Sequence, residues 1–181
     1  SDPLGQSSEM PVHIIRGARE GPTLAVTAAI HGDELNGTGI IHHLIYGADH
    51  EAGTKDDHID AKTMSGTLIL VPVVNVEGML LQQRHSTDGR DINRLFPGKP
   101  DGNHSQRLAH ALFKQVVKRA DYLIDLHTAP YTRMNVPHVR ADLDKKSCKR
   151  LARAFGTEVI LHSVGPDGSI RREASDGGIP T

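Results

Sequence analysis

Two almost unbroken apolar runs, each followed by polar or turn-forming residues, constrain the fold of this chain more than any other feature. The runs are Thr23–Ile30 (TLAVTAAI) and Thr67–Val74 (TLILVPVV). Runs of this length are typical of strands buried on both faces, which occur in parallel sheets covered by helices. We therefore predict an α/β fold, with a mainly parallel sheet and helices on both of its faces.

The remaining segments alternate between strand and helix patterns. In chain order we expect a strand at Val12–Gly17, a helix at Glu34–Tyr46 ended by Gly47, a helix at Ser105–Ala120, a strand at Tyr122–Leu126, a helix at Asp142–Phe155, a strand at Thr157–Leu161 and the start of a strand at Ile179. The polar stretch Asp49–Ser65 is predicted to be an exposed insertion. Asn75–Pro100 is rich in turn signals and is predicted to be largely loop, which at this length is usually functional or disordered.

Length and composition exclude several classes of function. A chain of 181 residues suits a single domain with a sizeable core. A net charge of −1 argues against the basic surface that binds nucleic acid or anionic membranes, and 3% aromatic residues argue against base stacking. No apolar run approaches the roughly 18 residues that span a bilayer. Cys148 is the only cysteine, is expected to pack inside its helix, and suits a reducing, cytoplasmic location.

The first polar group follows the TLAVTAAI strand in the sequence His31-Gly32-Asp33-Glu34. Ligands of such sheets bind beyond the carboxyl ends of the strands. His31 and Glu34 are three residues apart across a strand-to-helix junction, which lets an imidazole nitrogen and a carboxylate oxygen reach one cation. Gly32 lacks the Cβ that would crowd this turn. Taken alone, the pattern also fits an ordinary helix start with an acidic first turn.

The second polar group, Asp125-Leu126-His127-Thr128, follows the predicted strand YLIDL. A histidine from a second strand would complete the usual catalytic zinc set of three protein ligands and a water. Such a site lowers the pKa of its bound water to about 7. Asp125 is a candidate partner that orients a ligand histidine. On its own, His127 would equally fit a hydrogen-bonded histidine at a strand end.

The third group is a loop that holds three arginines and an asparagine, from Arg84 through the run RDINRLFPG at 90–98. Amide hydrolysis develops an oxyanion, and one positioned donor is worth about 3–4 kcal/mol. A bidentate arginine is also the natural anchor for a substrate carboxylate. The three arginines could instead be ordinary exposed charges of a loop, or partners of Asp88 and Asp91. Asp91 is expected to brace the loop.

HGDE, RDINRLFPG and DLHT, in this order, resemble the succinylglutamate desuccinylase/aspartoacylase family of zinc carboxypeptidase-like hydrolases. The resemblance covers about residues 23–181 and implies a three-layer α/β/α fold around a mainly parallel, mixed sheet. It also implies one zinc ion per chain. The residues implied as zinc ligands are His31, Glu34 and His127.

The same resemblance implies roles for the arginine loop. Asn93 and Arg94 would bind the substrate carboxylate, and Arg84 would polarise the scissile carbonyl, with Arg90 as its rival. The expected reaction is zinc-dependent hydrolysis of an N-acyl amino acid, a small-molecule partner, to a carboxylate and a free amino acid. Homo-oligomerisation stays open. The alternatives are a metallocarboxypeptidase that trims peptides and a metal-binding module without turnover. A lid over the site, which the Asp49–Ser65 insertion could form, would favour a small substrate, whereas an open groove would favour peptides.

One departure concerns the family's general base, a glutamate on the strand that follows a GIP-type sequence. Here Gly178-Ile179-Pro180 is followed only by Thr181, so we expect the base beyond Thr181. We accordingly expect residues 10–181 to be a C-terminally incomplete catalytic domain, preceded by a disordered leader or remnant at 1–9. Glu173, the nearest carboxylate, is predicted to be a helix-surface residue. The polar cluster of His50, Asp56, Asp57, His58 and Asp60 is predicted to be solvated loop.

Overall fold

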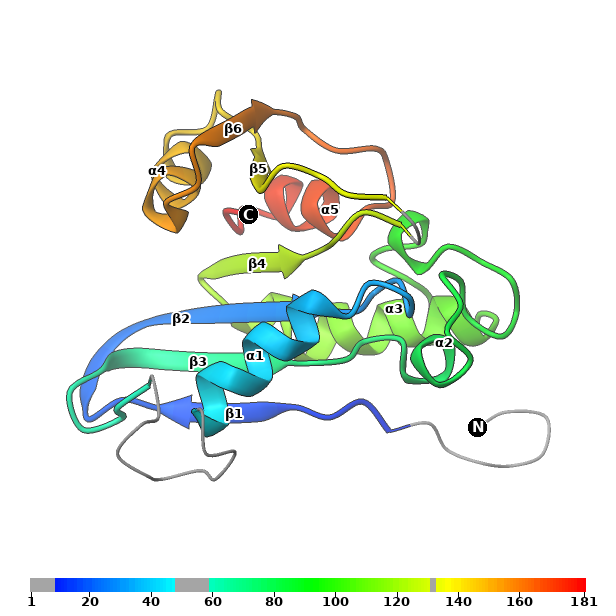
Figure 1. Cartoon of the computed structure of the whole chain (residues 1–181), viewed down its shortest axis with the longest axis horizontal. Coiled ribbons are helices and arrows are strands. Elements are labelled where there is room, and N and C mark those ends of the chain that lie inside the picture. The colour runs from blue at the N-terminus through cyan, green and yellow to red at the C-terminus, as the bar shows by residue number, and fades with distance from the viewer. Residues whose placement is uncertain (1–8, 48–58, 131–132) are drawn as a thin grey trace.

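Four strands form one sheet in which three run parallel. The computed structural model describes residues 9–47, 59–130 and 133–181. The strand order is β1-β3-β2-β4, with bounds β1 (His13–Arg16), β2 (Arg19–Ala28), β3 (Ser65–Val71) and β4 (Tyr122–Leu126). β2 pairs in parallel with β3 and β4, and β1 is an antiparallel edge strand (Figure 1). The mixed, mainly parallel sheet confirms the predicted fold class.

The two apolar runs form the central strands β2 and β3. Ala25 and Val26 are consecutive in β2, are both buried and lie in different core clusters, as expected for a strand covered on both faces. β2 begins earlier than the apolar run because its exposed start at Arg19 pairs with Ser65. β3 ends before Pro72, which has no N–H to offer a neighbouring strand.

Helices cover both faces of this sheet. On one face, α1 (Asn36–Tyr46) packs its buried Ile41 and Ile45 against β2 and β3. On the other face, the larger core cluster joins the sheet to α3 (His104–Gln115) and α5 (Ile170–Asp176). The three-layer α/β/α arrangement is therefore confirmed. Within the described residues, no helix is both long and apolar enough to cross a membrane.

Several predicted helix bounds were wrong. The first helix begins at Asn36 rather than Glu34, because the Glu34 N–H donates to the His31 carbonyl in a turn. The predicted helix over 105–120 ends at Gln115 and is followed by a separate 3-10 turn, η2 (Val117–Arg119). The helix predicted to begin at Asp142 is α4 (Lys146–Phe155), because the Asp142 side chain accepts the Asp144 N–H and holds a non-helical turn.

The segment predicted to be largely loop, 75–100, contains two short helical elements. α2 (Val76–Leu80) is capped by Asn75, whose side chain accepts the Gly78 N–H. η1 (Ile92–Arg94) is capped by Asp91, whose side chain accepts the Asn93 N–H. Both are shorter than the window over which a hydrophobic period can be read, so their caps were the only signal in the sequence.

A second, two-stranded sheet lies beyond β4 (Figure 1). It pairs β5 (His138–Ala141) in parallel with β6 (Val159–His162). β5 was not predicted, and the strand predicted at Thr157–Leu161 begins two residues later, at Val159. The strand expected to start at Ile179 is not formed. The chain nevertheless runs alongside β4 there, because the Leu123 N–H donates to the Pro180 carbonyl at 2.9 Å.

Three predictions fall wholly or mainly outside the described residues. The leader at 1–9 lies outside them except for its last residue, and so do His50, Asp56, Asp57 and His58 of the polar cluster. The lid proposed for the insertion at 49–65 involves residues 49–58, which also lie outside. These expectations stay predictions.

Candidate metal centre

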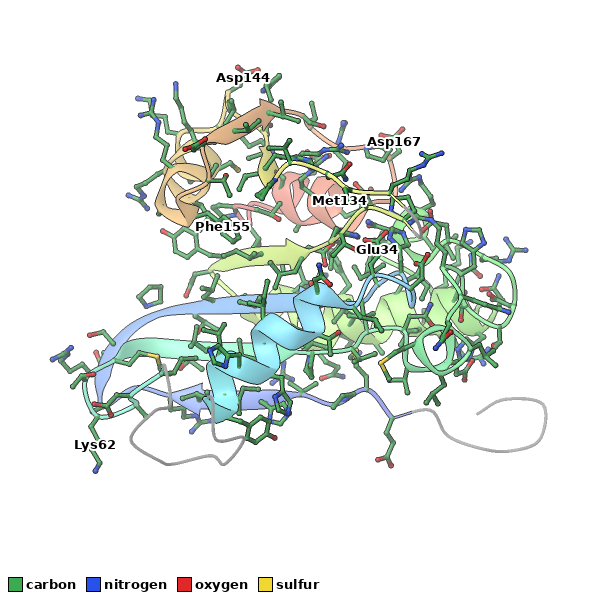
Figure 2. All side chains as sticks on the ribbon, viewed as in Figure 1. Glu34, Lys62, Met134, Asp144, Phe155 and Asp167 are labelled. Atoms are coloured by element: carbon green, nitrogen blue, oxygen red, sulfur yellow. The ribbon has the colours of Figure 1, made fainter. Side chains whose placement is uncertain are left out.

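The three predicted metal ligands come from the ends of two neighbouring parallel strands. His31 and Glu34 lie in the turn between β2 and α1, and His127 directly follows β4. Ala28, at the end of β2, is paired with Leu126, at the end of β4, so the two strands deliver these side chains to the same edge of the sheet. Figure 2 shows Glu34 at this edge, whereas Lys62 and Asp144 lie at the periphery of the molecule.

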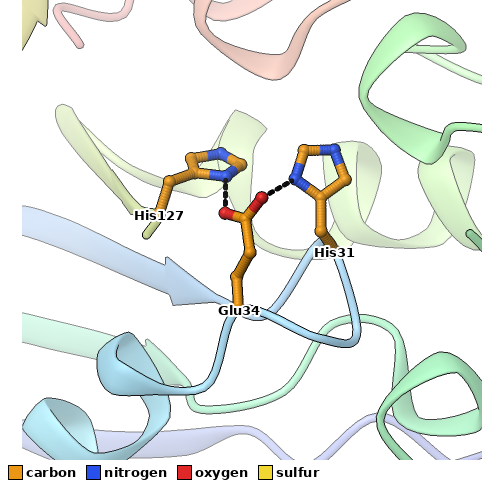
Figure 3. Close-up of side chains that lie close together, drawn as sticks. All are labelled: His31, Glu34 and His127. Atoms are coloured by element: carbon orange, nitrogen blue, oxygen red, sulfur yellow. Dashed lines mark hydrogen bonds and ion pairs between the residues drawn. The ribbon is translucent and has the colours of Figure 1, made fainter. Parts of the chain in front are cut away.

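Both imidazole rings turn the same nitrogen toward one carboxylate (Figure 3). His31 Nδ1 lies 2.9 Å from Glu34 Oε1, and His127 Nδ1 lies 2.8 Å from Glu34 Oε2. One ligand atom from each of the three residues lies within 4.8 Å of the other two. His31 and Glu34 are only 4% and 2% exposed, whereas His127 is exposed, so the cluster has a buried base and one side open to solvent.

The turn that holds His31 and Glu34 depends on two local features. Ala29 has a φ of 49°, a left-handed conformation that ends β2 and redirects the chain into the turn. Gly32 packs directly against the backbone of α2: a Cβ at this position would lie 2.1 Å from the Gly78 carbonyl carbon. Position 32 of the HGDE sequence therefore needs glycine, because a side chain there would collide with the backbone of α2. This agrees with the prediction that a Cβ would crowd the turn.

A second carboxylate contacts the far nitrogen of each histidine. His127 Nε2 lies 2.6 Å from Asp125 Oδ2, and the Thr27 hydroxyl donates to Asp125 Oδ1. His31 Nε2 lies 3.2 Å from Asp91 Oδ1. The sequence suggested Asp125 for this position but gave Asp91 only a bracing role, since nothing in its pattern shows that the loop folds back onto His31. Carboxylate partners of this kind fix the orientation of ligand histidines.

The electrostatics of the cluster favour a bound cation. Burial would raise the pKa of Glu34, but hydrogen bonds from His127 and His31 outweigh it and hold this pKa well below its usual range. Burial would lower the pKa of His127, yet the charge of Asp125 and bonds to Asp125 and Glu34 raise it to about 10. The pKa of His31 is likewise raised, against burial, by its bonds to Asp91 and Glu34. The neighbouring carboxylates thus favour the protonated form of both rings.

This donor set fits zinc. Two imidazole nitrogens and a carboxylate, converging on one point and oriented by outer carboxylates, are the ligands and supports that catalytic zinc takes in proteins. The Nδ1 atoms of both rings face Glu34, where a divalent cation would displace any proton bound to them. A backbone donor, the Thr128 N–H at 3.1 Å from Glu34 Oε2, further fixes the carboxylate; sequence reasoning had no signal for it.

The arginine loop reaches this cluster at one side. Arg84 Nη1 donates to Glu34 Oε1 at 2.7 Å and a second nitrogen lies 3.8 Å from Asp91 Oδ2. Asn93 Nδ2 lies 3.5 Å from His127 Nε2. Arg94 is exposed at the rim and donates to the Asn93 carbonyl. Arg90, the rival of Arg84, is exposed and bonds Ser86 and Asp88 through its backbone.

A further arginine, Arg171, was not singled out from the sequence. Its guanidinium is half-buried near Asp125, and it donates to the Ser163 hydroxyl and the Arg140 carbonyl. Burial and the charge of Arg140 lower its pKa, and Asp125 opposes this. A cation placed here was not predictable, because its only sequence signal is an Arg-Arg pair at the start of a short helix.

A second group of metal-ligand types, Asp142, Asp144 and His162, differs from the first in chemistry. His162 Nδ1 accepts the Leu143 N–H, and Lys145 Nζ lies 3.8 Å from Asp142 Oδ2. A lysine ammonium therefore already supplies the positive charge at this group.

Replacing Asp91 with alanine is expected to weaken zinc binding about 10- to 100-fold, the usual effect of losing a partner that orients a ligand histidine. The physical reason is the loss of the acceptor that holds His31 Nε2. Competition against a chromophoric chelator measures the dissociation constant. Asp101→Ala, at an exposed aspartate in the same half of the chain, is the control. An unchanged zinc affinity in Asp91→Ala would show that Asp91 only braces the loop.

Comparison with known proteins gives a consistent set of relatives. Residues 20–180 match the model of the succinylglutamate desuccinylase/aspartoacylase catalytic domain. The chain is 30% identical over 158 residues to the N-alpha-acetyl-L-2,4-diaminobutyric acid deacetylase of Halomonas elongata, an alignment that covers 84% of this chain and 43% of that protein.

Solved structures show the same fold. A succinylglutamate desuccinylase/aspartoacylase from Rhodobacter sphaeroides has a TM-score of 0.80 and 29% identity, covering 95% of this chain and 50% of that one. The murein-tripeptide amidase MpaA of Escherichia coli O157, at 16% identity, has a TM-score of 0.59 over 91% of this chain and 71% of its own, and shows the fold alone. The chain thus spans about half the length of its first relatives.

Proposed function

Because the chain belongs to the succinylglutamate desuccinylase/aspartoacylase family, we propose that it forms the metal-binding part of an enzyme that hydrolyses the amide bond of an N-acyl amino acid. The observation that supports this most is the convergence of His31, Glu34 and His127 on one point at the carboxyl edge of the sheet. We propose one zinc ion per chain on these three residues. Bound there, zinc would supply a Lewis acid for the amide carbonyl and would lower the pKa of a bound water to about 7.

The chain's own residues divide the remaining tasks. Arg84 is fixed by Glu34 and Asp91 beside the cluster, where its guanidinium donates to the oxygen that gains charge as the amide carbonyl is attacked. Asn93 and Arg94, one in the site and one at its rim, bind the substrate carboxylate. The general base is proposed to be a glutamate outside residues 1–181. The products are a carboxylate and a free amino acid. The reaction is proposed to take place in the cytoplasm.

A substrate panel tests this proposal and separates it from peptide trimming. The full-length, zinc-loaded protein is incubated with N-acetyl, N-succinyl and N-formyl amino acids and with dipeptides, and free amine is measured. Hydrolysis of one N-acyl amino acid supports the proposal and identifies the acyl group. Hydrolysis of dipeptides alone would replace it with a metallocarboxypeptidase. Stoichiometric zinc without any hydrolysis would reduce the site to metal binding.

Zinc binding is expected to release protons at neutral pH, because the pKa of His127 is raised to about 10 and that of His31 is also raised, so that the metal displaces protons held on the rings. The sign follows directly: zinc affinity rises as the pH rises toward these pKa values and falls as the pH drops. Calorimetry in two buffers of different ionisation enthalpy counts the protons. Release of no proton would mean that the metal binds elsewhere or that the rings are neutral beforehand.

A further inference from the structure

Hydrogen bonds connect the start of α5 to the loop that holds Asn93 and Arg94. The Phe96 N–H donates to the Gly168 carbonyl at 2.9 Å, and the Ile170 N–H donates to Asn93 Oδ1, also at 2.9 Å. Gly168 has a φ of 72°, and a Cβ on it would lie 2.3 Å from the Arg94 carbonyl oxygen. Two segments that are more than 70 residues apart in sequence are therefore in backbone contact.

This contact determines which way the Asn93 amide faces. Its oxygen accepts the Ile170 N–H, so its NH₂ group is directed to the other side, toward His127 at 3.5 Å. Rotating the amide by a half-turn would bring the NH₂ group against the Ile170 N–H, and two donors would then face each other in a buried position, since Ile170 is fully buried. Asn93 therefore presents donors, not an acceptor, to the site.

Glu173 holds the start of α5 in this position. Its Oε1 accepts the Gly168 N–H at 3.1 Å, while Ser169 caps the helix by accepting the Arg172 N–H and donates to the Pro166 carbonyl. Glu173 was predicted to be a helix-surface residue. It is half-buried instead, and its carboxylate is used within the chain. The turn at 166–169 is thus fixed from both sides, which in turn fixes the N–H that Asn93 accepts.

We propose that the segment from Gly168 to Glu173 is the positioning element for the substrate-carboxylate anchor, with Glu173 orienting Asn93 through Gly168 and Ile170. The inference rests on the proposed function, since it names what positions the carboxylate donors of that site. Glu173 acts as a hydrogen-bond acceptor and not as an acid or base. Its role depends on an oxygen at that place, and not on its charge.

The test compares Glu173→Ala with Glu173→Gln in the full-length, zinc-loaded protein, with Arg172→Ala as the control on the same helix. Glutamine keeps the oxygen that accepts the Gly168 N–H. The Arg172 side chain pairs with Asp176 and, at 4.0 Å, with the exposed carboxylate of Asp167, and it makes no contact with Glu173 or Asn93 among the bonds and ion pairs of the described residues. Losing one hydrogen bond that positions a binding group is expected to raise KM about five- to tenfold in Glu173→Ala. Glu173→Gln and Arg172→Ala should stay within about twofold of the starting KM. Zinc affinity should not change in any of them.

Amide hydrogen exchange gives a readout that does not depend on activity. The Ile170 N–H should exchange about fivefold faster in Glu173→Ala than in the starting protein, and not in Glu173→Gln. If Glu173→Gln is as impaired as Glu173→Ala, charge or proton transfer is at work and the proposal is wrong. It is also wrong if Glu173→Ala changes neither KM nor this exchange. A protein inactive on every N-acyl amino acid would overturn the proposed function, while the exchange result would still decide the positioning role.

Discussion

Exchanging Glu34 for glutamine is expected to remove zinc and abolish hydrolysis. Glu34 is the centre of the cluster: its two oxygens contact His31, His127, Arg84 and the Thr128 N–H. The glutamine amide is the same size but carries no charge, so it binds zinc poorly. Its NH₂ group would also replace one oxygen and face groups that are themselves donors. Zinc affinity should fall by more than the 10- to 100-fold that an outer-shell partner is worth.

Zinc content after dialysis, far-ultraviolet circular dichroism and free-amine release measure this together. The expected result is a folded protein that retains no zinc and gives no product. Glu20→Gln, at an exposed glutamate near the start of β2, is the matched control and should keep both. Full zinc content in Glu34→Gln would place the metal elsewhere and would remove the basis of the proposed function.

Replacing Arg84 with alanine is expected to lower kcat about 10²- to 10³-fold, because one positioned donor to a developing oxyanion has an effect of that size. Arg84 is set for this task by its 2.7 Å bond to Glu34, beside the metal ligands. KM should change much less, because the interaction strengthens only as charge develops. Steady-state kinetics of the full-length enzyme separate the two constants.

Arg90→Ala is the companion variant for this prediction. The exposed Arg90 side chain lies on the same loop but is not among the groups around Glu34, so its loss should leave kcat within about threefold, the range of a surface charge. The opposite pattern, with Arg90→Ala impaired and Arg84→Ala active, would exchange their roles. Equal rises in KM for both would assign them to substrate binding.

Much of the architecture was predictable because it follows from burial. The runs at 23–30 and 67–74 are typical of strands in a covered sheet, and most of each run lies in β2 or β3. The helix before Gly47 was also predicted, although it begins later than expected. Element bounds were less predictable, since side-chain caps decide them: Asp142 delays α4, and the turn of His31 to Glu34 delays α1. Strand β5 is only four residues long and has too little pattern to be found alone.

The candidate site divides in the same way. His31, Glu34 and His127 lie at strand ends that the apolar pattern predicts, and the family resemblance implied that they act together. The pairing of β2 with β4, which brings them together, is seen only in the structure. Contacts made by loops folding back were not predictable. Asp91 reaches His31, and Glu173 reaches the turn behind Asn93, through loop paths for which a single sequence contains no signal.

Restoring activity with measured amounts of zinc tests the central claim most directly. The full-length protein is stripped with a chelator, dialysed and titrated with zinc while free-amine release from an N-acyl amino acid is followed. The account predicts no activity in the stripped protein, a linear recovery, and a break at one zinc ion per chain that is absent in Glu34→Gln. Undiminished hydrolysis by protein shown to contain no metal would contradict the account.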